Sequence, residues 1–392
     1  MMDFLFTLKE DIDRGIMKKA MQRCMKRYPY FSFRMIQTDT GLDMVENPLP
    51  VTVGDSISQE IVLGSSDVNY HWIAAACEGK TLRLSMSHLM ADGRSALWFY
   101  KTLLWCYLTE RYQLALDSAG IRHPESPVLP DEDIKAETLL EDAEGMNPQS
   151  VTDPFLLPEE NTENRWYKIK IPAREFMAFG KSNDSSPVAL LSVFMAQMFC
   201  ELFPENEKAI YSSVAADIRK AVHTPNSHFT NTNVIFIRHD PKKMNRSYEE
   251  LGTMTRGQLI LQGDPVNLRY KYNALLRVQA AMAKAKDPSE QQRLMASAYQ
   301  LVTSNPTYSL SYVGDPEWRD LEPFIEEEFT LVDGRKLCLE VNYAGGNFCI
   351  CWVQKFDSTR YIEAFQRLLR ENGIPCDVAG PYPMPRTKCR LI

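Results

Sequence analysis

Apolar residues recur at two different periods along the first third of the chain, and these periods predict both helices and strands. The apolar side chains of residues 14–27 fall at the spacing of one helix face, and Pro29 marks the end of this helix. A strongly apolar stretch predicts a second helix over residues 95–112. Alternation predicts four short strands between these helices, at residues 31–36, 42–46, 68–77 and 81–88.

The remainder of the chain also mixes the two periods. Strands are expected at residues 166–171, 209–216, 233–238, 308–313, 324–331, 336–343 and 348–356. Helices are expected at residues 174–179, 187–202 and 358–369, with two or three more between residues 248 and 303. Strands and helices in both halves indicate an α/β or α+β fold class.

Charge is unevenly distributed and marks a division between the two halves. Residues 117–163 hold thirteen acidic side chains, two basic ones and six prolines. This composition predicts a long surface crossover between two folded parts. We therefore divide the chain into an N-terminal subdomain of residues 1–116, a crossover of residues 117–164 and a C-terminal subdomain of residues 165–392.

Composition and short motifs indicate which partners, cofactors and cellular compartment to expect. A net charge of −7 argues against a nucleic-acid partner. The longest apolar run, residues 188–200, is shorter than the ~20 residues of a membrane span and predicts a buried helix. Charged residues follow the N-terminus at once, and the nine cysteines form no C-x-x-C pair, which favours a cytoplasmic protein with reduced thiols. Zinc, phosphate-loop and dinucleotide motifs are missing from the sequence, so neither a metal nor a bound cofactor is expected.

One segment joins a strand, a histidine and a helix, and it carries the chemistry. Alternation along Leu82-Arg-Leu-Ser-Met-Ser-His88 places His88 on the apolar face, where the strand ends, and Asp92 and Gly93 follow before the next helix. An imidazole titrates near neutral pH and acts well as a general base. Two plainer interpretations stay open: His88 as a core histidine bonded to backbone, and Asp92 as a helix cap.

The His88-x-x-x-Asp92-Gly93 pattern resembles that of the CoA-dependent acyltransferase superfamily, which includes chloramphenicol acetyltransferase-like enzymes and condensation domains. Other segments resemble the family in the same order: residues 20–34, 217–219 and 309–314. The likeness extends over about residues 3–374 and is closest to bacterial alcohol acetyltransferase-like proteins. Thr232 replaces the glycine of a Gly-Asn pair that is usual in the family, and Ser87 replaces the first of two histidines that are typical of condensation domains.

The resemblance implies a fold and a reaction. Two chloramphenicol acetyltransferase-like subdomains, each a mixed sheet packed with helices, would enclose an active-site tunnel. The enzyme would be alcohol O-acetyltransferase-like. It would pass an acetyl or other short acyl group directly from acyl-CoA to a small alcohol or amine acceptor, with His88 as the catalytic general base. The acyl-CoA would be a co-substrate, with no resident cofactor.

The resemblance also implies roles for other residues. Asp92 would orient the loop by pairing with Arg219, and Gly93 would permit a tight turn. Ser311 and Asn233 are candidates for stabilising the oxyanion, and Tyr312 is a candidate for lining the tunnel. The other five histidines have no partner pattern and are expected to be structural or at the surface.

Two alternatives remain open at this stage. In the first, the chain is a stand-alone condensation-type domain that takes its acyl group from a phosphopantetheine carrier protein. In the second, it is a non-catalytic descendant of the fold that binds ligands. The identity of the acceptor, the acyl length and the oligomeric state are left undetermined by the sequence.

Overall fold

The computed structural model describes residues 1–39, 41–135, 151–284, 289–290, 293–294 and 305–390. The strands are β1 (Met2–Leu8), β2 (Phe33–Thr38), β3 (Gly41–Glu46), β4 (Val53–Gly54), β5 (Ile61–Leu63), β6 (Ile73–Glu78), β7 (Thr81–Met86), β8 (Arg165–Pro172), β9 (Ile210–Asp217), β10 (Thr232–His239), β11 (Tyr308–Tyr312), β12 (Ile325–Val332), β13 (Leu337–Ala344), β14 (Asn347–Gln354), β15 (Asp377–Pro383) and β16 (Thr387–Cys389). The helices are α1 (Arg14–Arg27), α2 (Gly93–Tyr112), α3 (Ala173–Ser182), α4 (Pro187–Leu202), α5 (Tyr248–Gln262), α6 (Pro265–Lys284) and α8 (Arg360–Glu371).

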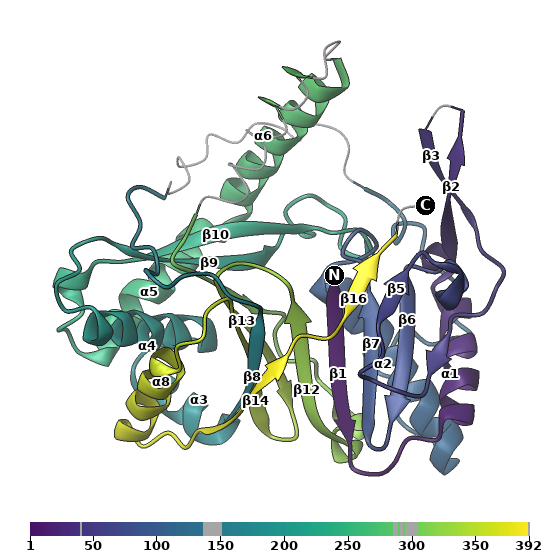
Figure 1. The fold of residues 1–392 in the computed structure, drawn as a ribbon, viewed down its shortest axis with the longest axis horizontal. Coiled ribbons are helices and arrows are strands. Elements are labelled where there is room, and N and C mark those ends of the chain that lie inside the picture. Colours follow the sequence, from purple (N-terminus) through teal and green to yellow (C-terminus); the bar gives the residue numbers. More distant parts are fainter. Residues whose placement is uncertain (40, 136–150, 285–288, 291–292, 295–304, 391–392) are drawn as a thin grey trace.

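The first lobe is a five-stranded sheet in the order β12-β1-β7-β6-β4, with helices α1 and α2 packed on it (Figure 1). Helix α1 begins where the Asp13 side chain accepts a hydrogen bond from the backbone N–H of Ile16 at 2.9 Å. Its apolar stripe, centred on Met17, Met21 and Cys24, is fully buried in the core of this lobe.

The second lobe is a seven-stranded mixed sheet in the order β10-β9-β11-β13-β14-β8-β15. Strand β11 runs parallel to β9 and β13, and the other neighbouring pairs are antiparallel. Helices α3, α4, α5 and α8 lie beside this sheet (Figure 1). Each lobe is therefore a mixed sheet packed with helices, as expected from the sequence.

Helix α4 is the buried helix that the longest apolar run predicts. The Ser186 side chain caps it by accepting a hydrogen bond from the backbone N–H of Ala189 at 3.4 Å, and Pro187 occupies its first turn. Within the described residues, we find no single helix with the length and apolarity to cross a membrane. The bent pair α3 and α4 passes that test together, by length and composition alone.

Strand β12 joins the two lobes. It comes late in the chain, yet it pairs antiparallel with β1 in the first sheet, with Met2 opposite Val332. Side chains from strands of the second sheet, among them Trp166, Cys338 and Cys351, belong to the core of the first lobe. Strand β16 also reaches the first lobe, where it pairs parallel with β5. The core of the first lobe therefore extends across the boundary to the second sheet.

The crossover is not confined to the surface, contrary to the prediction from its composition. The carboxylate of Glu132 is fully buried and forms ion pairs with Arg27 at 2.5 Å and Arg122 at 3.0 Å. These arginines, together with the hydroxyl of Tyr30 at 2.8 Å, supply the donors that a buried carboxylate requires. Residues 136–150 of the crossover lie outside the described residues.

The predicted elements mostly match the observed ones to within two residues, and α1 matches at both ends. The strand expected from Val68 begins at Ile73 instead, because residues 66–68 form a short 3-10 turn that ends at Asn69 in the left-handed conformation. Strands β4, β5, β15 and β16 were not predicted, since they are short or irregular. The third helix expected before residue 303 falls largely outside the described residues.

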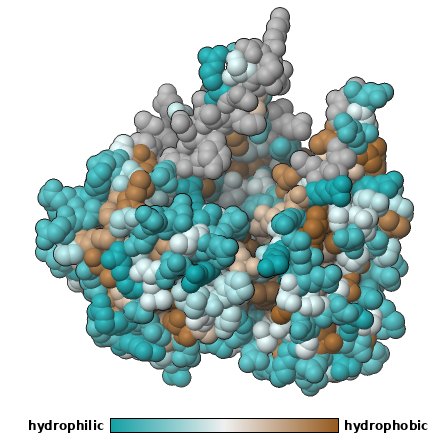
Figure 2. Space-filling model, viewed as in Figure 1, coloured by the Kyte–Doolittle hydropathy of each residue, from teal (hydrophilic) through white to brown (hydrophobic). Residues whose placement is uncertain are grey.

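The face shown in Figure 2 is mostly hydrophilic, with apolar side chains in small groups. On the same side of the molecule, the β2–β3 hairpin projects from the first lobe and α6 from the second (Figure 1). The large apolar side chains are mainly in the two cores.

A buried polar cluster fixes both chain ends to the first sheet. The Arg83 side chain is fully buried and donates from Nε to Asp3 Oδ1 at 2.9 Å and from Nη1 to the carbonyl of Ile57 at 2.8 Å. The Thr387 hydroxyl of β16 donates to the same Asp3 oxygen at 2.8 Å, and the Ser85 hydroxyl also contacts it. Asp3 is therefore the only described side chain in ion-pair contact with Arg83.

Substitution Asp3→Asn is expected to lower the free energy of unfolding by about 3–5 kcal/mol, because it leaves the buried Arg83 charge unpaired. The measurement is denaturant-induced unfolding of both proteins. Asp55→Asn is the matched control, because Asp55 pairs with Arg14 at an exposed site and surface pairs contribute little. Equal losses for the two variants would contradict the structural role of Asp3.

Candidate active site

A cavity of about 820 Å³ lies between the two lobes. One wall comes from β1, β12 and the segment after β7, and the other from β9, β10, β11 and β13. His88, Asp92, Gly93, Ser311 and Tyr312 all line this cavity. Its volume is within the usual range for small-molecule sites. His88 and Ser311, which are more than two hundred positions apart in the sequence, thus line the same cavity.

His88 is placed by a turn and not by the strand. Strand β7 ends at Met86, and the backbone N–H of Met90 donates to the carbonyl of Ser87 at 3.1 Å. His88 is exposed and lines the cavity, so the prediction that it continues the buried apolar face is wrong. The reason is that strand alternation stops two residues before it. The interpretation of His88 as a buried core histidine is excluded by the same observation.

The His88 loop (residues 87–92) is fixed by a loop of the second lobe that we call the clasp loop (residues 227–232). The Thr230 hydroxyl donates to the carbonyl of His88 at 3.0 Å. The Nδ1 atom of His228 lies 3.1 Å from the carbonyl of Met90. The ring of His228 also stacks on Tyr30, with centroids 4.2 Å apart. The backbone that carries His88 is therefore held from across the cavity.

Asp92 is both a helix cap and an ion-pair partner, so the two interpretations of it are compatible. Its Oδ1 accepts from the backbone N–H of Ser95 at 3.0 Å, which caps α2, and also from Arg219 Nη2 at 2.8 Å. Its Oδ2 accepts from the backbone N–H of Asn231 at 2.9 Å and from the hydroxyl of Thr232 at 3.0 Å. Both carboxylate oxygens thus accept hydrogen bonds from the second lobe.

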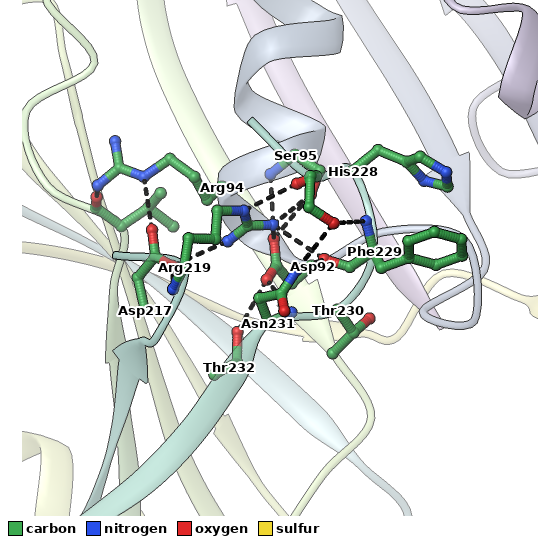
Figure 3. A network of polar contacts seen from close by, with 12 residues as sticks. Asp92, Arg94, Ser95, Asp217, Arg219, His228, Phe229, Thr230, Asn231 and Thr232 are labelled. Atoms are coloured by element: carbon green, nitrogen blue, oxygen red, sulfur yellow. Dashed lines mark hydrogen bonds and ion pairs between the residues drawn. The ribbon is translucent and has the colours of Figure 1, made fainter. Parts of the chain in front are cut away.

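Arg219 is the centre of the network in Figure 3, where its side chain extends toward Asp92. The side chain is 2% exposed, so the interpretation of Arg219 as a surface charge is wrong. It donates to the Ser227 carbonyl at 2.9 Å, to Asp217 Oδ1 at 3.0 Å and to the Ser95 hydroxyl at 2.7 Å, besides Asp92. A planar guanidinium suits such a site because its five donors point in fixed directions.

The surroundings of Asp92 decide its protonation. Burial acts to raise the pKa of this carboxyl, but the charge and hydrogen bonds of Arg219, with the backbone N–H groups of Ser95 and Asn231, lower it below its ordinary value of 3.8. The carboxylate is therefore ionised at neutral pH. The ion pair with Arg219 is accordingly a permanent link between the lobes under ordinary conditions.

Gly93 is required by a close approach and not by a turn. It is the first residue of α2 and has no positive φ, so the prediction of a glycine-dependent turn is wrong. A Cβ atom at this position would lie 2.9 Å from Cγ2 of Val313 in the second lobe. The absence of a side chain lets the start of α2 approach β11.

The wall of the second lobe contains two of the three predicted residues. Ser311 and Tyr312 line the cavity, and the Tyr312 ring packs against Phe348 with centroids 5.9 Å apart. Asn233 is not among the lining residues, so its assignment to the cavity wall is wrong. Its neighbours Thr232 and Val234 in β10 line the cavity instead.

Sequence reasoning missed several ionisable side chains of the cavity, among them the carboxyl group of Glu340 in β13. Burial raises its pKa to about 7, although the Ser311 hydroxyl and the Cys338 thiol act to lower it. A glutamate within the alternating sequence Cys338-Leu-Glu-Val-Asn342 was the available indication. Among the described residues, no group of three or more histidine, cysteine or acidic side chains could hold a metal ion.

Substitution Asp92→Asn is expected to lower the free energy of unfolding by about 3–5 kcal/mol at neutral pH, because it leaves Arg219 buried without its main counter-charge. The folded-state pKa of Asp92 lies below 3.8, so its stabilising effect is complete above that pH and is lost as the pH falls through the folded value. The difference between wild type and variant should therefore shrink below pH 3.8.

Denaturant unfolding of both proteins across this pH range is the measurement. Asp357→Asn is a matched control, because Asp357 pairs with Arg165 at 2.7 Å on the surface and its side chain is 58% exposed. A loss for Asp92→Asn no larger than that of the control would contradict the proposed tie between the lobes.

No protein-family model and no curated protein matches the sequence. Solved structures do match over nearly the whole chain. The TRI101 protein of F. graminearum, crystallised with coenzyme A and T-2 mycotoxin, has a TM-score of 0.63 at 11% identity, covering 97% of this chain and 96% of that one.

Two further structures give similar values. Polyketide synthase associated protein 5 of Mycobacterium tuberculosis has a TM-score of 0.59 at 14% identity, covering 94% of this chain and 93% of its own. The condensation domain of the Monacolin K polyketide synthase MokA has a TM-score of 0.59 at 12% identity, covering 94% and 91%. The chain thus has the chloramphenicol acetyltransferase-like fold that it shares with these proteins, one of which is a condensation domain.

Proposed function

We propose that this protein is an acyltransferase that moves an acetyl or other short acyl group from acyl-CoA to a small alcohol or amine. The observation that carries the proposal is the position of His88, which lines the cavity between the lobes on a loop held from the second lobe. The structural similarity to TRI101, which was crystallised with coenzyme A and a small molecule, supports this donor and acceptor class.

His88 is the general base in this reaction. Its imidazole takes the proton of the acceptor hydroxyl or amine while that oxygen or nitrogen bonds to the thioester carbonyl carbon. The tetrahedral intermediate then breaks its carbon–sulfur bond. The departing thiolate of coenzyme A takes the proton from His88, which restores the base. The acyl group passes directly to the acceptor, so the enzyme needs no nucleophilic side chain.

Four further residues assist this reaction from fixed positions. Asp92 and Arg219 are positioning residues, because they hold the backbone of the His88 loop and do not touch the reacting atoms. Ser311 lines the cavity and carries a hydroxyl, so it is the candidate donor to the oxyanion of the intermediate. Tyr312 forms part of the same wall and shapes the acceptor space.

The second candidate function uses an acyl thioester on a phosphopantetheine carrier protein as the donor. The structural similarity to the MokA condensation domain supports this candidate. The chemistry at His88 would be unchanged, since phosphopantetheine presents the same thioester as coenzyme A. Thiol release from free acyl-CoA separates the two. Release that depends on both acceptor and His88 supports the first donor, and release only from a loaded carrier protein supports the second.

Substitution His88→Ala is expected to lower turnover by about 10²–10⁴-fold, because the acceptor loses the group that takes its proton. The measurement is thiol release from a panel of acyl-CoAs with pooled alcohols and amines. The fold should be retained, because the structure gives contacts to the backbone of His88 that the substitution leaves in place.

His223→Asn serves as the control for loss of a histidine. His223 is exposed and has a φ of 59°, a conformation that asparagine adopts readily, so its turnover should equal that of wild type. Unchanged turnover in His88→Ala would refute its assignment as the base. Absence of thiol release from folded wild-type protein, with free and carrier-bound donors alike, would favour a binding role.

A further inference from the structure

Glu340 projects into the cavity from the wall of the second lobe. Along β13, Leu337 and Leu339 belong to the core of that lobe, whereas Cys338, Glu340 and Asn342 line the cavity. Strand β11 pairs with β13 in a register that puts Ser311 opposite Glu340. The carboxyl group therefore lies beside the proposed oxyanion donor, on the wall that faces the first lobe.

Four carboxylates line the cavity, and Glu340 differs from the rest in its charge environment. The other three have a cation within ion-pair distance: Asp92 with Arg219 at 2.8 Å, Asp217 with Arg219 at 3.0 Å, and Asp333 with Lys355 at 3.3 Å. Glu340 has no such ion pair among those found in the described residues, and Arg94, which also lines the cavity, pairs with Asp217 at 3.7 Å.

The contacts that Glu340 does make come from neutral groups. The Cys338 thiol lies 3.4 Å from its Oε1, and the Ser311 hydroxyl is the other neutral group that acts to lower its pKa. These donors do not offset burial, which raises the pKa of Glu340 to about 7. A carboxylate has about four acceptor positions, more than these two neutral neighbours can occupy. A ligand that brought a positive charge would supply both the missing donors and the counter-charge.

We propose that Glu340 binds a positively charged nitrogen of the acceptor, separate from the group that attacks the thioester. The acceptor would then be an amino alcohol or a polyamine. This inference rests on the proposed acyltransferase function. Neighbouring polar groups suit such a molecule: the Ser213 and Ser309 hydroxyls, 2.9 Å apart, and the Asn342 side chain also line this wall. An anionic acceptor would be repelled by the same carboxyl.

Matched pairs of acceptors test the inference with acetyl-CoA as donor. Choline is compared with dimethylbutanol, in which carbon replaces the charged nitrogen, and putrescine is compared with butylamine. Wild type should prefer choline and putrescine, which carry a charged nitrogen separate from the attacking group, over their partners by about tenfold or more in kcat/KM. Glu340→Gln keeps the shape but not the charge, and it should reduce this preference by about tenfold to a hundredfold.

Glu326→Gln is the matched control, because Glu326 is an exposed glutamate of β12 that does not line the cavity. It should keep the wild-type preference. The inference is overturned if wild type shows no preference for the charged acceptors, or if Glu340→Gln retains that preference in full. Either result, obtained together with thiol release from neutral acceptors, would leave the proposed function intact.

Calorimetric titration with choline and with putrescine separates the inference from the reaction. Wild type and Glu326→Gln should bind these cations, and Glu340→Gln should bind them at least about tenfold more weakly. Cation binding that depends on Glu340, in a protein that releases no thiol, would support the cation site and refute the acyltransferase. No loss of affinity in Glu340→Gln would refute the cation site.

Discussion

The ion pair between Asp92 and Arg219 is the interaction on which the candidate site depends. Both side chains are almost completely buried, so each charge needs the other to offset the cost of leaving water. Asp92 starts helix α2 and ends the His88 loop, and Arg219 belongs to the second lobe. The same pair therefore fixes the beginning of a helix, the position of a loop and the distance between two lobes.

The cavity exists because neither lobe is complete by itself. Strand β12 closes the edge of the first sheet next to β1, and residues from the second sheet enter the core of the first lobe. The two sheets are thus held apart at a fixed spacing by shared packing, and the polar clasp loop spans the gap on one side. The remaining space is lined from both lobes and has His88 on one wall and Glu340 on the other.

Local patterns in the sequence were sufficient for most elements and for the central motif. Helix α1 was predicted to the residue because its apolar spacing and Pro29 agree. Periodicity carries no information about contacts between segments that are distant in the sequence. Examples are the burial of Glu132 against Arg27, the approach of Val313 to Gly93, and the pairing of β12 with β1.

The face of His88 was mispredicted because alternation does not continue for the two residues past the end of β7. Asn233 was misplaced because the motif, and not the strand register, was used to choose it.

The position of β1 has a consequence for how the protein reaches its fold during synthesis. Residues 2–8 are translated more than three hundred residues before β12, yet β1 lies inside a sheet between β7 and β12, and β12 ends at residue 332. Until that strand is translated, one edge of β1 has unpaired backbone groups, which is a site for mispairing and aggregation. The nascent chain must therefore wait for residues 325–332 before β1 is covered on both edges, so this sheet can be completed only after β12 has been translated.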